Sequence, residues 1–322
     1  MVTRHSSVPP PVTEVLDASS RWLPARLGEV EQLLREAIAG QGEALGGDAA
    51  ATLEAGGKRL RPMLVLLCAG PEGSAAAAHA AAAIELIHMA TLVHDDVLDD
   101  APLRRGLPTV AATSGRARAV ATGDLLFSRA FALLADAGDA RAVALLADAS
   151  VALARGELTQ RQDAFDLSVS EERYLARCRL KTARLFECAC LLGHDEESLR
   201  EFGAGIGLAF QLLDDVLDVS GPPERTGKAR GTDLLDGTVT LPLIEAAAAD
   251  PGLREVDLHA LDAAAAEQLC DRIAATGALD RVRARALEMV AGAKRSLRRG
   301  GFEPEQRQLL ALVADGVVQR YS

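Results

Sequence analysis

The sequence predicts an all-α protein, and three observations point to that fold class. Hydrophobic residues make up 49% of the 322 residues, yet only 3% are aromatic. Alanine and leucine dominate the apolar positions, with Glu and Arg scattered among them, whereas the Val, Ile, Tyr and Trp runs typical of strands are scarce. Apolar residues also recur at helical spacing. Because no repeat and no interior linker divides the chain, we expect one domain over residues 21–322.

The elements follow from the positions of glycine, proline and the apolar stripes. Residues 1–20 contain Ser, Pro and no long apolar stretch, so we expect a disordered N-terminal tail. Helices are predicted at residues 22–38, 62–69, about 75–100, 118–136, 140–164, 171–192 and 196–219, with Pro and Gly at several of the breaks. Residues 101–115 and the glycine-rich stretch 221–237 are expected to be loops, and three or four more helices should follow to residue 321.

Charge and cysteine content limit the function classes. A net charge of −11 without a broad basic face argues against nucleic acid as a partner. The five cysteines are expected to be buried thiols of a protein in the reducing cytoplasm. The most apolar segment, residues 75–93, contains two histidines and a glutamate, which favours a buried core helix over a membrane span.

Two acidic clusters share the spacing Asp-Asp-x-x-Asp, and each stands at the end of an apolar helical stretch. They are Asp95, Asp96 and Asp99, and Asp214, Asp215 and Asp218. Carboxylates at i and i+4 lie on one helix face, where like charges repel unless a cation lies between them. Mg²⁺ prefers oxygen ligands and completes its shell with water and phosphate oxygens. The pair of clusters therefore predicts a magnesium-dependent diphosphate site.

Basic residues near the clusters supply a counterpart to the carboxylates. Residues 56–62 read GGKRLRP, a glycine-freed turn with three cations at a helix start, which is a suitable phosphate site. The others are Arg104, Arg105, Lys181, Thr182 and Lys228. Each alone would be read as solvated surface, but together with both clusters they favour diphosphate binding. His88 lies on one stripe with Asp95, so we favour a phosphate role over simple core packing, whereas His94 points elsewhere and should cap or pack.

These residues resemble the trans-isoprenyl (polyprenyl) diphosphate synthase family, over about residues 53–244. The matching motifs are GGKRLRP (56–62), ELIHMATLVHDDVLDD (85–100), LRRGLPT (103–109), GDLLFSRAF (123–131), GELTQ (156–160), KTARLFE (181–187), FQLLDDVLD (210–218) and GKARGTDLLDGTVTLPLI (227–244). The resemblance implies a bundle of about ten or more helices around a deep central cavity, of the isoprenoid synthase type. It also implies a homodimer.

The resemblance assigns roles to residues of this chain. Isopentenyl diphosphate would be held by Lys58, Arg61, His88 and Arg105, and the allylic diphosphate by Arg104, Lys181, Thr182, Gln211 and Lys228. Magnesium ions, three with substrate bound, would be held mainly by Asp95, Asp99 and Asp214, with Asp96, Asp215 and Asp218 in support; Mn²⁺ could substitute. The catalytic set would consist of Asp95, Asp96, Asp99, Lys181, Asp214, Asp215 and Lys228. Thr232 departs from the pattern, because many members have lysine there.

The implied reaction is a head-to-tail condensation. Mg²⁺ and the cationic side chains neutralise the allylic diphosphate as it leaves, the double bond of isopentenyl diphosphate attacks the allyl cation, and a proton is lost. No side-chain nucleophile is required. No membrane anchor is evident, although a long polyprenyl product could leave through transient contact with a membrane.

Residues on the helix before Asp95 should set product length. Thr91, Ile87 and Ile84 share its stripe, each about one turn (~5.4 Å) deeper. In the family, bulky aromatics four or five positions before the first Asp stop the tail early. Here those positions are the small Thr91 and Ala90. The channel floor would then lie deeper, with Phe131 among the candidates.

The open upper channel predicts a long-chain all-trans product. A C20–C25 synthase remains an alternative. So do a subunit of a heteromeric synthase, which would usually lack one aspartate cluster, and a class I terpene cyclase, which would lack GGKRLRP.

Overall fold

A computed structural model describes residues 10–104, 106–221 and 230–319, and it confirms the all-α prediction. The N-terminal half contains α1 (Pro10–Ala18), α2 (Leu23–Ile38), α3 (Glu43–Glu54), α4 (Leu60–Ala69), α5 (Ala75–Leu98), α6 (Val110–Ser114), α7 (Arg116–Asp136) and α8 (Ala140–Gln162). Then follow α9 (Glu171–Cys178), η1 (Arg179–Ala183), α10 (Arg184–Gly193), α11 (Glu197–Ser220), α13 (Thr232–Leu235), α14 (Leu241–Ala249), η2 (Pro251–Glu255), η3 (Leu258–Ala260), α15 (Ala263–Ala275), α16 (Ala278–Ser296) and α17 (Pro304–Gln319).

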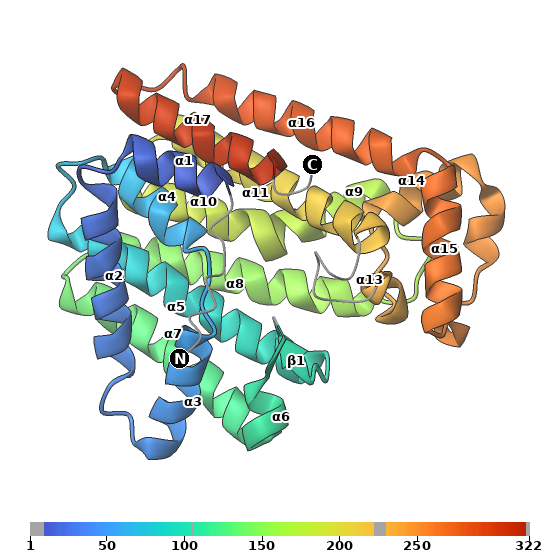
Figure 1. The fold of residues 1–322 in the computed structure, drawn as a ribbon, viewed down its shortest axis with the longest axis horizontal. Coiled ribbons are helices and arrows are strands. Elements are labelled where there is room, and N and C mark those ends of the chain that lie inside the picture. The colour runs from blue at the N-terminus through green and yellow to red at the C-terminus, as the bar shows by residue number, and fades with distance from the viewer. Residues whose placement is uncertain (1–9, 105, 222–229, 320–322) are drawn as a thin grey trace.

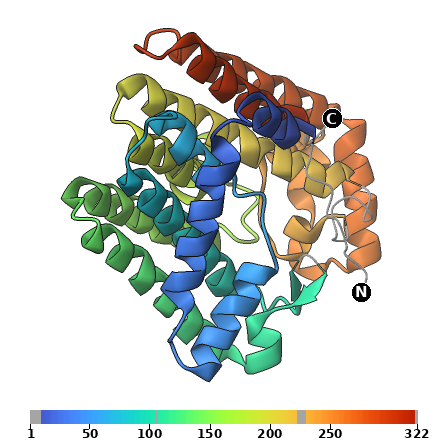
Figure 2. The ribbon, with the colours of Figure 1, turned by 60° about the vertical axis from the view of Figure 1, so that its left-hand side comes forward.

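The two helices that carry the acidic clusters lie inside the bundle. α5 packs against α7, α4 and α2, while α11 packs against α16 and α10. Helices α16 and α17 run along the top edge of Figure 1, and α2 and α3 come to the front in Figure 2. Each acidic cluster is therefore attached to a helix that is held by several neighbours.

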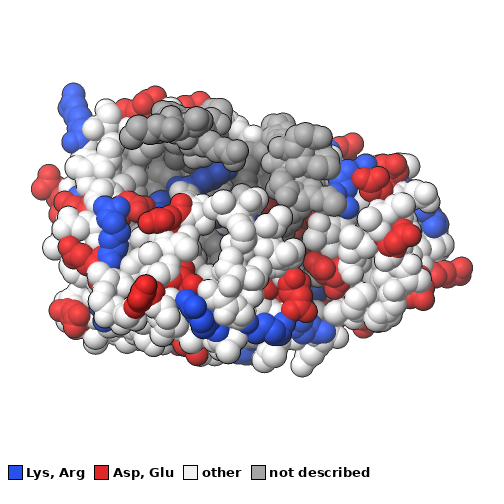
Figure 3. All heavy atoms as spheres, turned by 60° about the horizontal axis from the view of Figure 1, so that its bottom comes forward, with Lys and Arg blue, Asp and Glu red and all other residues white. Residues whose placement is uncertain are grey.

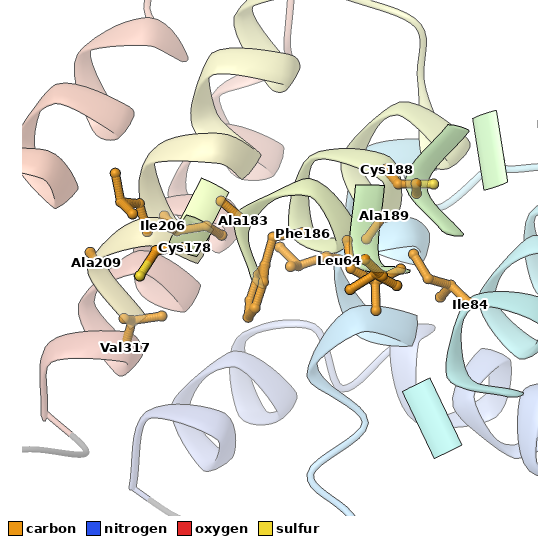
Figure 4. Packing of buried hydrophobic residues seen from close by; sticks show 14 of the residues in the cluster. Leu64, Ile84, Cys178, Ala183, Phe186, Cys188, Ala189, Ile206, Ala209 and Val317 are labelled. Atoms are coloured by element: carbon orange, nitrogen blue, oxygen red, sulfur yellow. The ribbon is translucent and has the colours of Figure 1, made fainter. Parts of the chain in front are cut away.

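One core cluster of buried apolar side chains joins these helices. Figure 4 shows Leu64, Ala189 and Ile84 together where α4, α10 and α5 meet. Phe186 is fully buried, and it belongs to the same cluster as Ile206 of α11. Full burial of such side chains contributes about 1.5–3 kcal/mol each. The apolar stripes that predicted the helices are thus the surfaces that hold them together.

The structure differs from the predictions made from the sequence in two segments, residues 10–18 and 101–115. The prediction of a disordered tail over residues 1–20 is wrong for residues 10–18, which form α1 and pack against α17. Val15 is only 1% exposed, and its burial provides the apolar contact that a disordered tail would lack. The expected loop at 101–115 contains a short hairpin, β1 (Leu103–Arg104) and β2 (Leu107–Pro108), followed by α6. Thr109 caps α6 by accepting a hydrogen bond from the backbone N–H of Ala112.

The helix predicted at 171–192 is present, but a π-helical segment, η1, interrupts it. Such segments are rare and occur frequently at functional sites. η1 contains Lys181 and Thr182, and it packs against α8 and α11. Gly156 of α8 permits the close approach, because a Cβ there would lie 2.6 Å from the backbone nitrogen of Lys181. The π segment therefore places a predicted substrate-binding pair between two helices.

Two further expectations concern the apolar helix and the cysteines. Within the described ranges, α5 alone is long and apolar enough to cross a membrane by length and composition, and 72% of its most apolar window is buried. That burial agrees with the predicted core helix. The five cysteines are free and buried, as expected. The C-terminal region contains four α-helices from α14 to α17, which also agrees with the prediction.

Candidate active site

The first acidic cluster lies at the C-terminal end of α5. Asp95 is half-buried, Asp96 is buried, and Asp99 is the exposed residue that directly follows the helix. The Asp96 carboxylate accepts a hydrogen bond from Nε of Arg104 at 2.7 Å, and Asp99 pairs with Arg161 of α8. The three carboxylates therefore differ in their surroundings. Asp96 is bonded by Arg104 of the hairpin, whereas Asp95 and Asp99 share another face at the end of the helix.

The surroundings of Asp95 favour a bound cation. The pKa of its carboxyl group is raised to about 6, mainly by burial; Lys181 lowers the pKa, Glu157 and Asp99 raise it, and Arg104 lowers it. A divalent cation beside Asp95 would reverse the effect of the neighbouring carboxylates, as bound metals generally do. This electrostatic environment supports the predicted role of Asp95 as a metal ligand.

The second acidic cluster lies near the C-terminal end of α11. Asp214 is exposed, Asp218 is half-buried, and Asp215 is buried. The Asp215 carboxylate accepts hydrogen bonds from Tyr174 Oη and, at 2.8 Å, from Nε2 of Gln211. Asp214 and Asp218 therefore keep the more accessible carboxylates, and Asp215 anchors the cluster to α9.

Side chains of η1 connect the two clusters. The Lys181 ammonium pairs with Glu157 of α8 and acts electrostatically on Asp95. The hydroxyl of the next residue, Thr182, donates a hydrogen bond at 2.6 Å to Oε1 of Gln211, which in turn bonds Asp215. Two adjacent residues thus link the first acidic cluster to the second. The fold therefore connects clusters whose first aspartates, Asp95 and Asp214, are 119 positions apart in the sequence.

The burial of Asp215 predicts a pH effect on stability. Its pKa is raised to about 8 by burial and by Asp233, against an unfolded value of about 3.9. The folded protein therefore retains a proton that the unfolded chain releases, and this contribution to stability is full below about pH 4 and lost as pH rises through about 8. In chelator-treated protein, we expect wild type to lose thermal stability relative to Asp215→Asn between about pH 5 and 8. Parallel melting curves for the two proteins would contradict the assignment.

The glycine-basic turn precedes α4. Lys58 is exposed, and Arg61 is half-buried with its guanidinium carbon 4.6 Å from the centre of the Phe186 ring. Burial lowers the pKa of Arg61 to about 10, so it remains charged at neutral pH. Within the described residues no carboxylate lies within ion-pair distance of Arg61, and its Nε has no hydrogen-bond partner. A desolvated cation of this kind can accept an anionic ligand.

A cavity of about 440 Å³ lies beside this turn. Gly56, His88 and Arg104 line it together with Glu85 and Asp96. Acidic and basic side chains border a hollow on the face turned forward in Figure 3. The structure thus brings His88 and Arg104 to one cavity with Gly56 of the glycine turn, and their roles in substrate binding stay predictions. Arg105 and Lys228 lie outside the described residues.

The predicted channel residues lie on the buried side of α5. Ile84, Ile87 and Ala90 are fully buried, and Thr91 is half-buried with its hydroxyl donating to the carbonyl of His88 at 2.8 Å. Phe131 of α7 is half-buried and packs against the core. His94 packs as predicted, stacking on Phe127 with ring centres 5.9 Å apart. Their role in chain length remains a prediction.

Several residues of the site were missed in the sequence. Glu157 and Arg161 lie one turn apart on α8 and bond each other at 2.9 Å, and Tyr174 holds Asp215. The GELTQ motif was a signal for Glu157, because a carboxylate near Lys181 is needed to orient it. Nothing local marked Tyr174, whose partner is 41 residues away.

The donor set suits magnesium. Asp95, Asp99, Asp214 and Asp218 offer only oxygen atoms, as Mg²⁺ prefers. No group of three potential metal ligands lies close enough to hold an ion by itself within the described parts of the chain. Mg²⁺ is usually held by one or two carboxylates and completes its shell with water and substrate phosphate oxygens.

Comparisons with known proteins agree with this geometry. The family model for polyprenyl synthetase matches residues 44–275, which is more than half of the chain. The chain belongs to the polyprenyl synthetase family. It is a prenyltransferase, and the family depends on magnesium.

Two of the curated relatives are named for long-chain products. The chain is 42% identical over 241 residues to heptaprenyl diphosphate synthase component 2 of Geobacillus stearothermophilus, covering 72% of this chain and 75% of the relative. It is 40% identical over 275 residues to all-trans-nonaprenyl-diphosphate synthase (geranyl-diphosphate specific) of Rhodobacter capsulatus, covering 81% and 84%.

Solved structures share the fold over nearly the whole chain. A polyprenyl synthase from Caulobacter crescentus CB15, complexed with calcium and isoprenyl diphosphate, superimposes with a TM-score of 0.90 at 33% identity, covering 98% of this chain and 99% of that one. That protein therefore binds a divalent cation together with a diphosphate on the same fold.

Proposed function

We propose that this enzyme condenses isopentenyl diphosphate head to tail with an allylic diphosphate to give a long-chain all-trans polyprenyl diphosphate. The observation that carries the proposal is the link through Lys181 and Thr182 between the two acidic clusters. This link supports a single site to which both acidic clusters contribute. The small Thr91 and the names of the heptaprenyl and nonaprenyl synthases, which share 42% and 40% identity with the chain, support the long-chain product.

Each reacting group has a set of residues to hold it. Lys58, Arg61 and His88 would bind the diphosphate of isopentenyl diphosphate, with Arg105. Arg104, Lys181, Thr182 and Gln211 would bind the allylic diphosphate, with Lys228.

The aspartates would hold the metal. Asp95, Asp99, Asp214 and Asp218 would hold Mg²⁺, three ions in all with Mn²⁺ as a substitute, and the metal would neutralise the departing diphosphate. The allylic C–O bond then breaks, the double bond of isopentenyl diphosphate forms the new C–C bond, and the proton lost is taken by the diphosphate. Lys181 stabilises the leaving group, and Glu157 keeps its ammonium oriented.

A product assay tests this function. The purified chain is incubated with Mg²⁺, isopentenyl diphosphate and allylic primers of several lengths, and the extracted products are separated by length. We expect linear products longer than C25. Products of C20–C25 would support the short-chain alternative, cyclic hydrocarbons would support a terpene cyclase, and activity only after addition of a second subunit would support a heteromer.

We propose a homodimer in the cytoplasm, formed through α7 and α8. Val151 and Leu158 of α8 are 59% and 63% exposed and lie seven positions apart, so they share one helix face. Val120 on the preceding helix α7 is also exposed. Large apolar side chains gathered on neighbouring helices are typical of interaction surfaces.

A charged residue introduced among the exposed apolar side chains of α7 and α8 should separate the subunits. We expect Leu158→Glu to weaken the dimer by about a hundredfold or more, because it would bury an unpaired carboxylate. Analytical ultracentrifugation measures the change. Leu287→Glu on α16 is the matched control, since Leu287 is 49% exposed on another helix. An unchanged dimer in Leu158→Glu would place the interface elsewhere.

A further inference from the structure

Arg59 occupies an unusual position in the glycine-basic turn. It lies between Lys58 and Arg61, and its φ of 47° and ψ of 34° put it in the left-handed region, directly before α4. Residues other than glycine rarely adopt this conformation unless the surrounding structure holds them there. The contacts of the side chain show what holds it.

The Arg59 guanidinium bridges two helices. Its Nε donates to Oε1 of Glu31 on α2 at 2.5 Å, and its Nη1 donates to Oε1 of Glu85 on α5 at 2.9 Å. Glu85 is only 4% exposed in an otherwise apolar stretch of α5. A buried carboxylate needs a cation, and Arg59 supplies it.

The charge of Glu85 also acts on Arg61. Arg61 lies two residues from Arg59, over the Phe186 ring, and among the described residues it pairs with no carboxylate. If Arg59 did not neutralise Glu85, Arg61, on which the charge of Glu85 already acts, would be drawn toward that buried carboxylate. Arg61 would then be less available to a diphosphate.

We propose that Arg59 is a positioning residue that neutralises Glu85 and, with Glu31, holds the turn so that Lys58 and Arg61 face the diphosphate of isopentenyl diphosphate. This inference rests on the proposed function of Lys58 and Arg61. Arg59 itself contacts carboxylates, and its effect on the substrate passes through its neighbours. Loss of Arg59 should therefore weaken one substrate and spare the other.

The test uses Arg59→Asn, because asparagine tolerates the left-handed conformation and removes the guanidinium. We expect the KM for isopentenyl diphosphate to rise about tenfold, as for loss of a charge-assisted contact, while the KM for the allylic diphosphate changes less than about twofold. Equal changes in both KM values would show a general structural effect and overturn the proposal.

A double variant separates charge neutralisation from loss of packing. In Arg59→Asn/Glu85→Gln the buried charge is gone, so Arg61 is released and most of the loss in KM should be recovered. A double variant no better than Arg59→Asn overturns the proposal. If Arg59→Asn does not fold, the double variant decides alone: a KM near wild type supports the proposal, and a KM as high as that of Arg61→Ala contradicts it.

The variant Arg61→Ala separates the proposed binding of substrate by Arg61 from the proposed positioning role of Arg59. If Arg61→Ala leaves the KM for isopentenyl diphosphate unchanged, the proposed role of Arg61 in substrate binding fails. If Arg61→Ala raises that KM and Arg59→Asn does not, substrate binding by Arg61 stands and the positioning role of Arg59 fails.

Discussion

Replacing Asp95 with asparagine should lower kcat by about a thousandfold, because it removes a metal ligand that helps to stabilise the leaving diphosphate. Asp95 is the carboxylate on which Glu157, Asp99 and Lys181 all act, so it lies at the electrostatic centre of the first cluster. Asparagine keeps the size of the side chain and removes the charge. Steady-state kinetics measures the loss, and calorimetric titration with Mg²⁺ and an unreactive diphosphate measures the metal affinity, which should fall as well.

Asp100→Asn is the matched control for this variant. Asp100 belongs to the same acidic run, but it is exposed and pairs with Arg116. Surface pairs of this kind contribute about 0–1 kcal/mol, so kcat should stay within about threefold of wild type. Similar losses in both variants would mean that net charge, and not a metal ligand, explains the effect of Asp95.

Replacing Thr91 with phenylalanine should shorten the product by several isoprene units. Thr91 is half-buried one turn before Asp95, and the two residues below it, Ile87 and Ile84, are fully buried. An aromatic ring there would meet the growing tail before it passes deeper. Chromatography of extracted products measures chain length, and the rate of the first condensation should change much less than the length.

Two variants on the same helix show whether the effect depends on the face. Leu92→Phe adds a ring to the cavity beside the glycine turn, which His88 and Arg104 also line, so turnover should fall while product length stays the same. Ala90→Phe introduces a ring at a fully buried position, which should destabilise the protein by about 1–3 kcal/mol. An unchanged product length in Thr91→Phe would mean that the channel runs along another face of α5.

The helices that hold the acidic clusters were predictable because their signals are local. Alanine and leucine at helical spacing, ended by Pro or Gly, predicted α5, α7 and α11 to within a few residues. The tail was mispredicted because α1 is stabilised by burial of Val15 and by packing against α17, at the opposite end of the chain. The π segment η1 was not predicted because its five residues have no distinct local pattern; its close contact with Gly156 is tertiary.

The residues of the candidate site also fall into those that the sequence predicted and those that it did not. The aspartates and most cations were found from spacing, since metal and phosphate chemistry requires particular residue types at particular intervals. Glu157, Tyr174 and the pair Arg59–Glu85 were not found, because each acts on a partner far away in the sequence.

By itself, the sequence determined the helical class, the two carboxylate clusters and the kind of chemistry, because periodicity and ligand spacing are properties of neighbouring residues. Only the tertiary structure decided which carboxylates remain accessible and which are anchored. Asp96 is held by Arg104, and Asp215 by Tyr174, whereas Asp95 is half-buried and Asp214 is exposed. The reason is burial: the local pattern gives each cluster three equal carboxylates, and desolvation and hydrogen bonds from distant helices make them different.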